Sequence, residues 1–265
     1  MTEEEVINSI GARPYRKDTS PLGFTEYIYN PSTKYTNYLM VQFAGGKVIG
    51  MSTISKYFCY DSLVSAGDSV STLTGKGFGT GTVGTYYKAV NASNQTVGTS
   101  AYLLKQSDAT VIAFSDYWGS KDIYGVYVFS NAYTLDKLSQ PKNGNYTTDV
   151  LTAMSTQTFE LLNAYMSQSV LNRNSKADGV AKAHSEALIK GQSDGTYKGD
   201  NGRLVTAGID YSVAGEFEYE NTADGIAAAH SFIHKQDSHY ALMNKKVDGA
   251  TLKDGDGSTH AYKYI

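Results

Sequence analysis

The spacing of apolar residues along the chain changes near residue 145. Before this point apolar and polar residues mostly alternate, which is the period of a half-buried strand. After it, apolar residues recur three and four positions apart, as they do on one face of a helix. Strands are predicted at residues 25–29, 38–43, 47–54, 84–89, 100–106, 110–117, 125–130 and 261–265. Helices are predicted at residues 150–169, 177–190 and 223–235, the last capped near residue 221 or 222.

Each of the two rounds of N-terminal strands follows a short predicted helix. Thr2 and Glu5 have the spacing of a capping box, and Gly11 ends the helix that they begin. The second short helix is predicted at residues 68–73. Helix followed by strands, twice, indicates an internal duplication of residues 1–60 in residues 61–140.

Turn signals separate these elements. Gly45 and Gly46 stand between the second and third predicted strands and favour a hairpin, because glycine accepts a positive φ. Residues 140–145 combine Pro141 with an Asn-Gly pair, which is typical of a linker. Two domains are therefore predicted, residues 1–143 and 147–265.

Composition narrows the class of protein. Apolar residues make up 41% of the chain and charged residues 18%, enough apolar material for a core. The net charge of -3, without a Lys/Arg cluster, argues against nucleic acid as a partner. No apolar run approaches the roughly 18 residues needed to span a membrane. Residues 1–5 are acidic, and no signal peptide is visible; we expect one to have been removed.

Cysteine and tyrosine content add two expectations. The single cysteine, Cys59, excludes an intrachain disulfide and is predicted to be a buried, inert thiol within an apolar run. The chain has 22 tyrosines, and those of its tyrosine-rich runs are expected mostly to pack across strands, although a tyrosine-rich face can also contact a protein or a glycan. The runs contain Tyr57, Tyr60, Tyr86, Tyr87, Tyr117, Tyr124, Tyr127 and Tyr133. Many Tyr and Gly residues with few charges are typical of surface proteins of Gram-positive bacteria.

Four short segments resemble the CAP superfamily, which includes cysteine-rich secretory proteins, antigen 5 and pathogenesis-related proteins. They are residues 161–165 (LLNAY), residues 183–188 (AHSEAL), Gly215-Glu216-Phe217 and Ser238-His239-Tyr240. Their order and spacing agree with the superfamily over residues 150–265. The resemblance implies a C-terminal α-β-α sandwich in which the three predicted helices cover a short antiparallel sheet.

The first part of the chain resembles the CAP-associated N-terminal domain of secreted Gram-positive proteins. The similar segments are residues 4–11 (EEVINSIG), 14–18 (PYRKD), 27–30 (YIYN) and 46–49 (GKVI). The expected fold class is thus α+β, with an N-terminal helix-plus-antiparallel-meander module before the CAP-type sandwich. The resemblance also implies that the protein is extracellular or lies at the cell surface.

The resemblance implies a degenerate groove. CAP domains point two histidines and two acidic residues into one cleft, and Glu216 and His239 match two of these four positions. A loop without histidine, residues 194–200, stands where the first histidine is expected. Residues 230–234 contain no acid where the second acid is expected. The predicted groove residues are His184, Glu216 and His239, with His184 packed beneath the groove.

Glu216 and His239 are the candidate catalytic residues, because a carboxylate beside an imidazole favours the charged form of each. The alternative is structural: His239 hydrogen-bonds a backbone carbonyl, and Glu216 orients it. Neither a poised nucleophile nor a Gly-x-Ser-x-Gly elbow is present. Whether the protein is an enzyme stays open, and the sequence leans towards no.

A zinc site is a further candidate. His230 and His234 are four positions apart and lie on one side of the predicted helix, and His239 could complete a three-imidazole set. Ser231 stands where a zinc protease has its general base. The alternative is that His230 and His234 flank the buried helix face and are partly exposed. Residues 254–258 (DGDGS) resemble the start of a calcium loop but lack its later acids. No other cofactor is expected.

The sequence therefore predicts an extracellular or cell-surface binding protein with a degenerate CAP groove. The groove and the N-terminal sheet are the candidate surfaces, and the partner is an unknown protein, glycan or lipid. The alternatives are a hydrolase, metal-assisted or protease-like, that uses Glu216 and His239, and a lipid-binding protein.

Overall fold

The computed structural model describes residues 1–29, 35–80, 87–133, 144–166, 171–211, 215–219 and 223–243. The chain divides into two compact units. Unit 1 comprises Met1–Ser167 and Tyr219–His239, and unit 2 comprises Gln168–Glu218 and Tyr240–Ile265.

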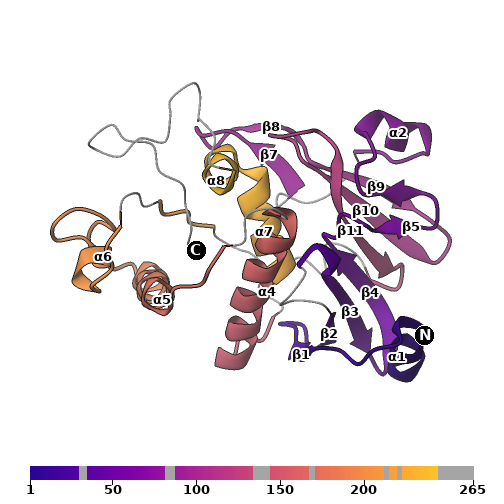
Figure 1. The fold of residues 1–265 in the computed structure, drawn as a ribbon, viewed down its shortest axis with the longest axis horizontal. Helices are drawn as coiled ribbons and strands as arrows, with labels where there is room; N and C mark the ends of the chain where they lie inside the picture. The colour runs from indigo at the N-terminus through magenta and orange to yellow at the C-terminus, as the bar shows by residue number, and fades with distance from the viewer. Residues whose placement is uncertain are drawn as a thin grey trace. The chain divides into compact units, whose positions relative to one another are not determined.

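Unit 1 is built on a seven-stranded antiparallel sheet (Figure 1). In spatial order its strands are β1 (Arg16–Thr19), β2 (Thr25–Tyr29), β3 (Leu39–Ala44), β4 (Lys47–Thr53), β11 (Ile123–Ser130), β10 (Ala109–Ser115) and β9 (Ala101–Lys105). Two small hairpins pair β5 (Cys59–Tyr60) with β6 (Val64–Ser65) and β7 (Lys88–Val90) with β8 (Thr96–Thr99). The unit also contains α1 (Glu3–Ile10), η1 (Tyr35–Asn37), α2 (Val70–Gly75), α4 (Thr148–Met166) and α7 (Gly225–His234).

Most predicted strands lie where alternation placed them. β2, β3, β4, β9, β10 and β11 begin and end within two residues of the predicted bounds. β7 begins at Lys88, and residues 84–86 of that prediction lie outside the described residues. β1 was not predicted, because its sequence, RKDT, contains no apolar residue that could alternate.

Local signals in unit 1 act as predicted. The Thr2 hydroxyl accepts a hydrogen bond from the Glu5 amide (3.2 Å), and the Thr2 amide donates to the Glu5 carboxylate (2.6 Å), which completes the capping box of α1. Gly11 ends the helix at φ 73°, in the left-handed region. Gly45 and Gly46 also have positive φ, 56° and 71°, and form the tight turn between β3 and β4.

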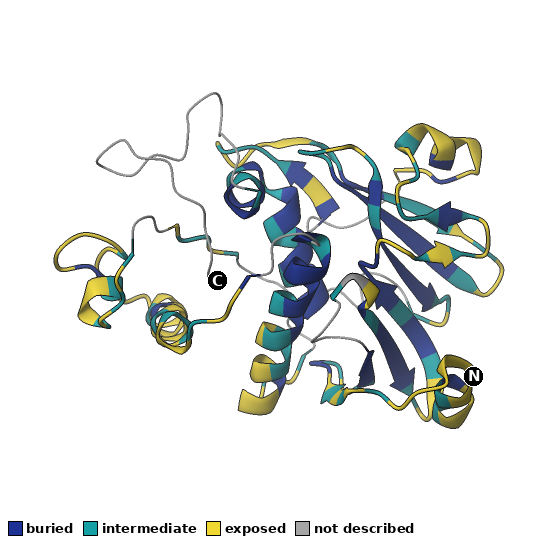
Figure 2. Ribbon diagram, viewed as in Figure 1, coloured by how far each residue is buried: buried dark blue, intermediate teal, exposed yellow. Residues whose placement is uncertain are grey.

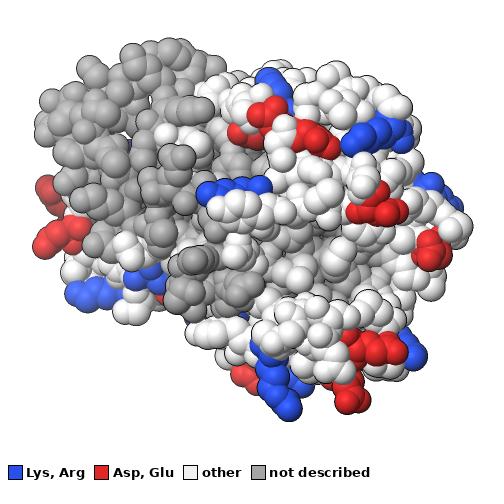
Figure 3. Space-filling view, turned by 45° about the vertical axis from the view of Figure 1, so that its right-hand side comes forward, with Lys and Arg blue, Asp and Glu red and all other residues white. Residues whose placement is uncertain are grey.

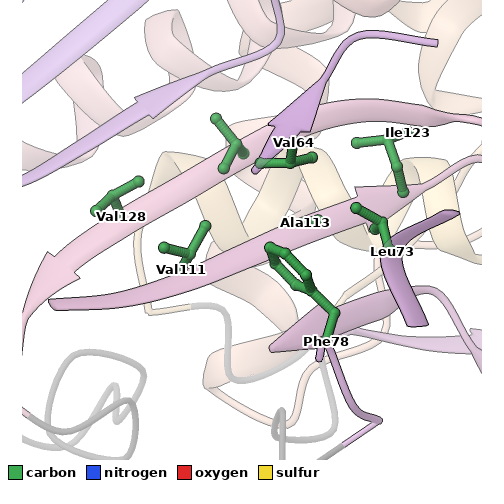
Figure 4. Packing of buried hydrophobic residues seen from close by; sticks show 8 residues of the cluster. Val64, Leu73, Phe78, Val111, Ala113, Ile123 and Val128 are labelled. Atoms are coloured by element: carbon green, nitrogen blue, oxygen red, sulfur yellow. The ribbon is translucent and has the colours of Figure 1, made fainter. Parts of the chain in front are cut away.

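One face of the sheet carries two hydrophobic clusters. Val6 of α1 packs against Tyr27, Tyr29, Val41 and Phe43. The second cluster lies under α2 and the β5–β6 hairpin (Figure 4), and consists of Val64, Leu73, Phe78, Val111, Ala113, Ile123, Val126 and Val128. Short helices thus cover this face, and burial of the apolar side chains stabilises the sheet.

α4 and α7 cover the opposite face. Phe114 of β10 lies on this face with Tyr127 and Phe129, and the His230 ring of α7 packs on it with a centroid separation of 3.7 Å. Gln157 of α4 donates a hydrogen bond to the buried Glu26 carboxylate of β2 (2.7 Å). The sheet is therefore enclosed on both sides. Of the predicted tyrosine-rich runs, Tyr87 and Tyr127 are buried, whereas Tyr57 is 69% exposed.

The sheet contains helix-plus-meander units in both halves. α1 precedes β2, β3 and β4, and α2 precedes β9, β10 and β11. The halves join through antiparallel pairing of β4 with β11, in which Met51 faces Val128. This order is the one expected from a duplication, which itself stays a prediction.

Polar contacts attach α4 to the edge of the sheet. Arg16 of β1 binds the Glu160 carboxylate through two parallel hydrogen bonds (2.6 and 2.9 Å), and Gln157 also donates to Asp18 (3.0 Å). Bidentate Arg–carboxylate pairs are among the stronger polar contacts in proteins. α4 and α7 thus belong to the same compact unit as the sheet, and the predicted boundary between residues 143 and 147 stays a prediction.

Unit 2 contains α5 (Ser175–Ile189) and α6 (Arg203–Thr206). Asn174 caps α5 by accepting hydrogen bonds from the amides of Lys176 and Ala177. α5 is largely exposed (Figure 2), and His184 is its buried residue. The described residues of this unit contain no strand; the predicted strand at 261–265 and the loop at 254–258 lie outside them. The predicted α+β class is confirmed by the whole set of elements.

Three expectations are corrected. α7 is capped by Asp224, whose carboxylate accepts a hydrogen bond from the Ala227 amide (2.8 Å), and not near residue 221 or 222. Cys59 is exposed, because it lies in a two-residue strand outside the main sheet. His230 and His234 are 0% and 1% exposed, not partly exposed, because α7 packs on the sheet.

The distribution of charged side chains on the surface agrees with the low net charge of -3. On the face drawn in Figure 3, Lys/Arg and Asp/Glu side chains of the described residues form small mixed groups among uncharged ones. A surface that binds phosphates needs clustered cations, and this face has none among its described residues. No helix of the described ranges has the length and apolar character required to cross a membrane.

Candidate binding site

The candidate site of unit 2 is centred on His184 of α5. Its Nδ1 lies 2.8 and 2.9 Å from the two carboxylate oxygens of Asp194. Its Nε2 lies 2.8 Å from Glu218 and 4.0 Å from Glu216. Both ring nitrogens of His184 therefore face carboxylates.

Arg203 of α6 joins two of these carboxylates. One of its terminal nitrogens donates to Asp194 (2.9 Å) and to the Gly195 carbonyl, and the other donates to Glu216. Gly202, the residue that caps α6, positions the start of that short helix. The guanidinium thus fixes the positions of Asp194 and Glu216. We call these five side chains, His184, Asp194, Arg203, Glu216 and Glu218, the His184 cluster.

The charges of the His184 cluster favour a protonated imidazole. The pKa of His184 is raised above its ordinary value, first by the hydrogen bond to Glu218 and then by that to Asp194, while partial burial opposes the shift. Three carboxylates face one guanidinium, so the cluster attracts a further positive charge. Glu218 provides access from solvent, because its side chain is 53% exposed.

The His184 cluster also contains a set of metal-ligating atoms. His184, Glu216 and Glu218 each offer a ligand atom within 4.8 Å of the other two. Within the described ranges no other group of three or more His, Cys, Asp or Glu residues meets this criterion. One imidazole nitrogen and two carboxylate oxygens suit zinc and related divalent ions.

Two of the three predicted groove residues are thus brought together, His184 and Glu216. His184 is buried, as predicted from the resemblance. His239 belongs to unit 1, where it is fully buried. Its Nδ1 lies 3.4 Å from the Tyr165 hydroxyl and its Nε2 lies 3.8 Å from Asp116. The proposed pairing of Glu216 with His239 joins residues of different units and stays a prediction.

The predicted zinc ligands have other contacts. The Tyr124 hydroxyl lies 2.7 Å from His230 Nδ1 and 2.8 Å from His234 Nε2. The two imidazole rings stack with a centroid separation of 5.5 Å. Burial, with His234 beside it, lowers the pKa of His230 well below its ordinary value. With His239 they form no metal-ligating group by the criterion above.

Sequence reasoning missed three members of the His184 cluster: Asp194, Arg203 and Glu218. Asp194 was noted only as part of a loop that lacks a histidine. Glu216 and Glu218 did carry a signal, because side chains two positions apart on an extended chain point to the same side. Arg203 carried no signal, since a single basic residue in a glycine-rich region has many possible partners.

Comparison with known proteins identifies the class of fold. No protein-family model matches the sequence, and no curated protein matches it significantly. An extracellular protein containing an SCP domain from Bacillus anthracis is similar in structure, with a TM-score of 0.71 and 16% identity over 92% of this chain and 86% of that one. A cysteine-rich secretory protein from Staphylococcus aureus has a TM-score of 0.62 and 13% identity over 96% and 89%. The chain therefore has the fold of SCP-domain proteins, and the CAP resemblance is confirmed at the level of fold.

Proposed function

We propose that the chain is an extracellular or cell-surface binding protein, and that the His184 cluster of unit 2 binds and does not hydrolyse. Its similarity in fold to an extracellular SCP-domain protein and to a cysteine-rich secretory protein supports the location. The chemistry of the cluster supports the absence of hydrolysis.

The observation that carries this proposal is that His184 has a carboxylate on each ring nitrogen. A general base needs a free lone pair within reach of the proton that it removes. The carboxylates favour the protonated form of His184, which has no lone pair to offer to a substrate proton. Glu216, the candidate catalytic acid or base, already accepts a hydrogen bond from Arg203 on one of its carboxylate oxygens.

His239 supports the same conclusion from unit 1. The residue is 0% exposed, and its ring lies between Tyr165 and Asp116. An imidazole that solvent does not reach is poorly placed to exchange protons with a substrate. The hydrolase alternative therefore lacks an accessible imidazole base at His239, its candidate histidine.

The absence of hydrolysis is tested with fluorogenic peptide and ester substrates on the full chain, with and without added Zn²⁺. We expect the wild type and Glu216→Gln to give the same background rate. General acid–base catalysis contributes about 10²- to 10⁴-fold. A wild-type rate that falls at least about 100-fold in Glu216→Gln or His239→Asn, with the fold retained, would replace this proposal by the hydrolase alternative.

Binding is tested by co-sedimentation of the full chain with purified Gram-positive cell walls. We expect Glu218→Gln to weaken retention, because Glu218 is the most accessible carboxylate of the His184 cluster. Glu186→Gln is the matched control: it removes an exposed carboxylate from α5 that lies 4.0 Å from Lys182 and is not part of the His184 cluster. Equal retention of the two variants, or extraction of lipid from vesicles without retention by cell walls, contradicts the proposal.

A further inference from the structure

We propose that the His184 cluster is a site for a divalent transition-metal ion of the zinc type, held by His184, Glu216 and Glu218. This inference rests on the proposed binding function of unit 2 and names the ligand of that site. Only Glu216 coincides with a position of the cleft described for CAP domains; His184 and Glu218 do not.

The separations of the ligand atoms fit such an ion. In a tetrahedral site, zinc lies about 2.1 Å from nitrogen and oxygen, so neighbouring ligand atoms are about 3.4 Å apart. His184 Nε2 lies 2.8 Å from Glu218 and 4.0 Å from Glu216, and these distances bracket that value. Small side-chain rotations of two glutamates, without movement of α5, therefore produce the required spacing.

Asp194 accepts a hydrogen bond from the ring nitrogen of His184 that would not bind the metal ion. A ligating histidine generally donates its other N–H to a carboxylate or carbonyl, which fixes the ring and its tautomer. Asp194 accepts from Nδ1 of His184 and leaves Nε2 directed at the two glutamates. Arg203 in turn holds Asp194 and Glu216 in place.

Charge and exposure complete the argument. Metal binding at Nε2 displaces the proton that the carboxylates favour there. The carboxylates of Asp194, Glu216 and Glu218 then outnumber the single guanidinium of Arg203, so a divalent cation offsets the negative excess. The His184 side chain is 11% exposed and that of Glu218 53%. The imidazole thus provides a shielded ligand, while the side of Glu218 stays open to an incoming ion and to a further ligand.

The test is a titration of the full chain, stripped with a chelator that is then removed, with ZnCl₂ by calorimetry and with CoCl₂ by visible absorption. We expect saturable binding, and a Co²⁺ spectrum typical of a low-coordinate site with nitrogen and oxygen ligands. His184→Asn and Glu218→Gln should weaken binding at least 10-fold. Asp194→Asn should weaken it by about 10- to 100-fold and alter the Co²⁺ spectrum, as loss of an outer-shell partner does.

Glu186→Gln is the control and should bind like the wild type. Circular dichroism shows whether each variant is folded. The Glu218 side chain is half exposed, so Glu218→Gln should stay folded even if His184→Asn does not. No saturable Zn²⁺ binding, or binding that His184→Asn and Glu218→Gln leave unchanged, overturns the inference. Either result without substrate turnover leaves the proposed binding function in place, whereas turnover that depends on Glu216 contradicts that function.

Discussion

Histidine occupies opposite environments in the two units. In unit 1, His230 and His234 are buried on α7 and share the hydroxyl of Tyr124. In unit 2, His184 faces three carboxylates, the nearest at 2.8 Å. The hydrogen bonds of His230 and His234 described above go to a tyrosine hydroxyl, whereas the neighbours of both His184 ring nitrogens are carboxylates.

The protonation state follows these environments. Burial lowers the pKa of His230, and the hydrogen bond that His184 donates to Glu218 raises the pKa of His184. The pair His230 and His234 joins α7 to Tyr124 of β11 and has a structural role. A protonated imidazole beside an exposed carboxylate can exchange its Nε2 proton for a metal ion that the carboxylate also binds. Residue type alone therefore distinguishes neither role, and the neighbours of the ring decide it.

The largest effect is expected from Tyr124→Phe, which removes the shared partner of His230 and His234. Each buried polar group that loses its partner costs about 1–3 kcal/mol, so we expect a loss of about 4 kcal/mol in the free energy of unfolding. Urea denaturation measures it. Tyr117→Phe is the matched control: its hydroxyl is at the surface, bonded to the Val97 carbonyl, and its loss should cost at most about 0.5 kcal/mol. Equal effects of the two changes would contradict the structural role of the histidine pair.

Glu26 extends the comparison to carboxyl groups, because it is buried in unit 1 whereas the carboxylates of the His184 cluster are partly exposed. Burial raises the pKa of Glu26 to about 7, although Gln42 and Gln157 donate hydrogen bonds to it. Because the folded state keeps a proton that the unfolded state releases above pH ~4.5, stability falls as the pH rises through about 7. The full effect is about 3 kcal/mol.

Glu26→Gln removes this titration, so its free energy of unfolding should fall less between pH 5 and pH 8 than that of the wild type. If the new amide destabilises the protein equally at every pH, the free energy of unfolding is lower throughout, but its dependence on pH is unchanged. Glu4→Gln, an exposed change in α1, should keep the wild-type slope. A Glu26→Gln slope equal to that of the wild type would show that Glu26 is ionised in the folded protein.

The smallest effects are expected in the titration of the two kinds of histidine, followed by NMR in the presence of a chelator. His184 should titrate above its ordinary pKa, and Glu218→Gln should lower that midpoint, while Glu186→Gln should not. His230 should stay neutral well below pH 6.5. The stabilisation from His184 is complete below about pH 6.5 and is lost as the pH rises through its folded pKa. That from His230 is lost as the pH falls below about 6.5. Identical midpoints would contradict the comparison.

Much of the fold of unit 1 could be predicted from short-range patterns, and little of the candidate site could. The capping box of Thr2 and Glu5 and the Gly45-Gly46 turn involve neighbours in sequence. The resemblance to CAP domains implied a buried His184, as the structure has it, and the assignment of Glu216 to a groove stays a prediction. It offered no indication that Glu218 and Asp194 bind the two nitrogens of His184.

The order, type and approximate bounds of most helices and strands were determined by the amino-acid sequence itself, because caps, glycine turns and apolar periods act over a few residues. Tertiary structure alone decided which charges meet. His184 and Glu218 are 34 positions apart, Tyr124 and His230 are 106 apart, and Glu26 and Gln157 are 131 apart. Contacts between such distant residues leave no periodic trace in the chain, yet these contacts and the burial that comes with them shift the pKa values of His184, His230 and Glu26.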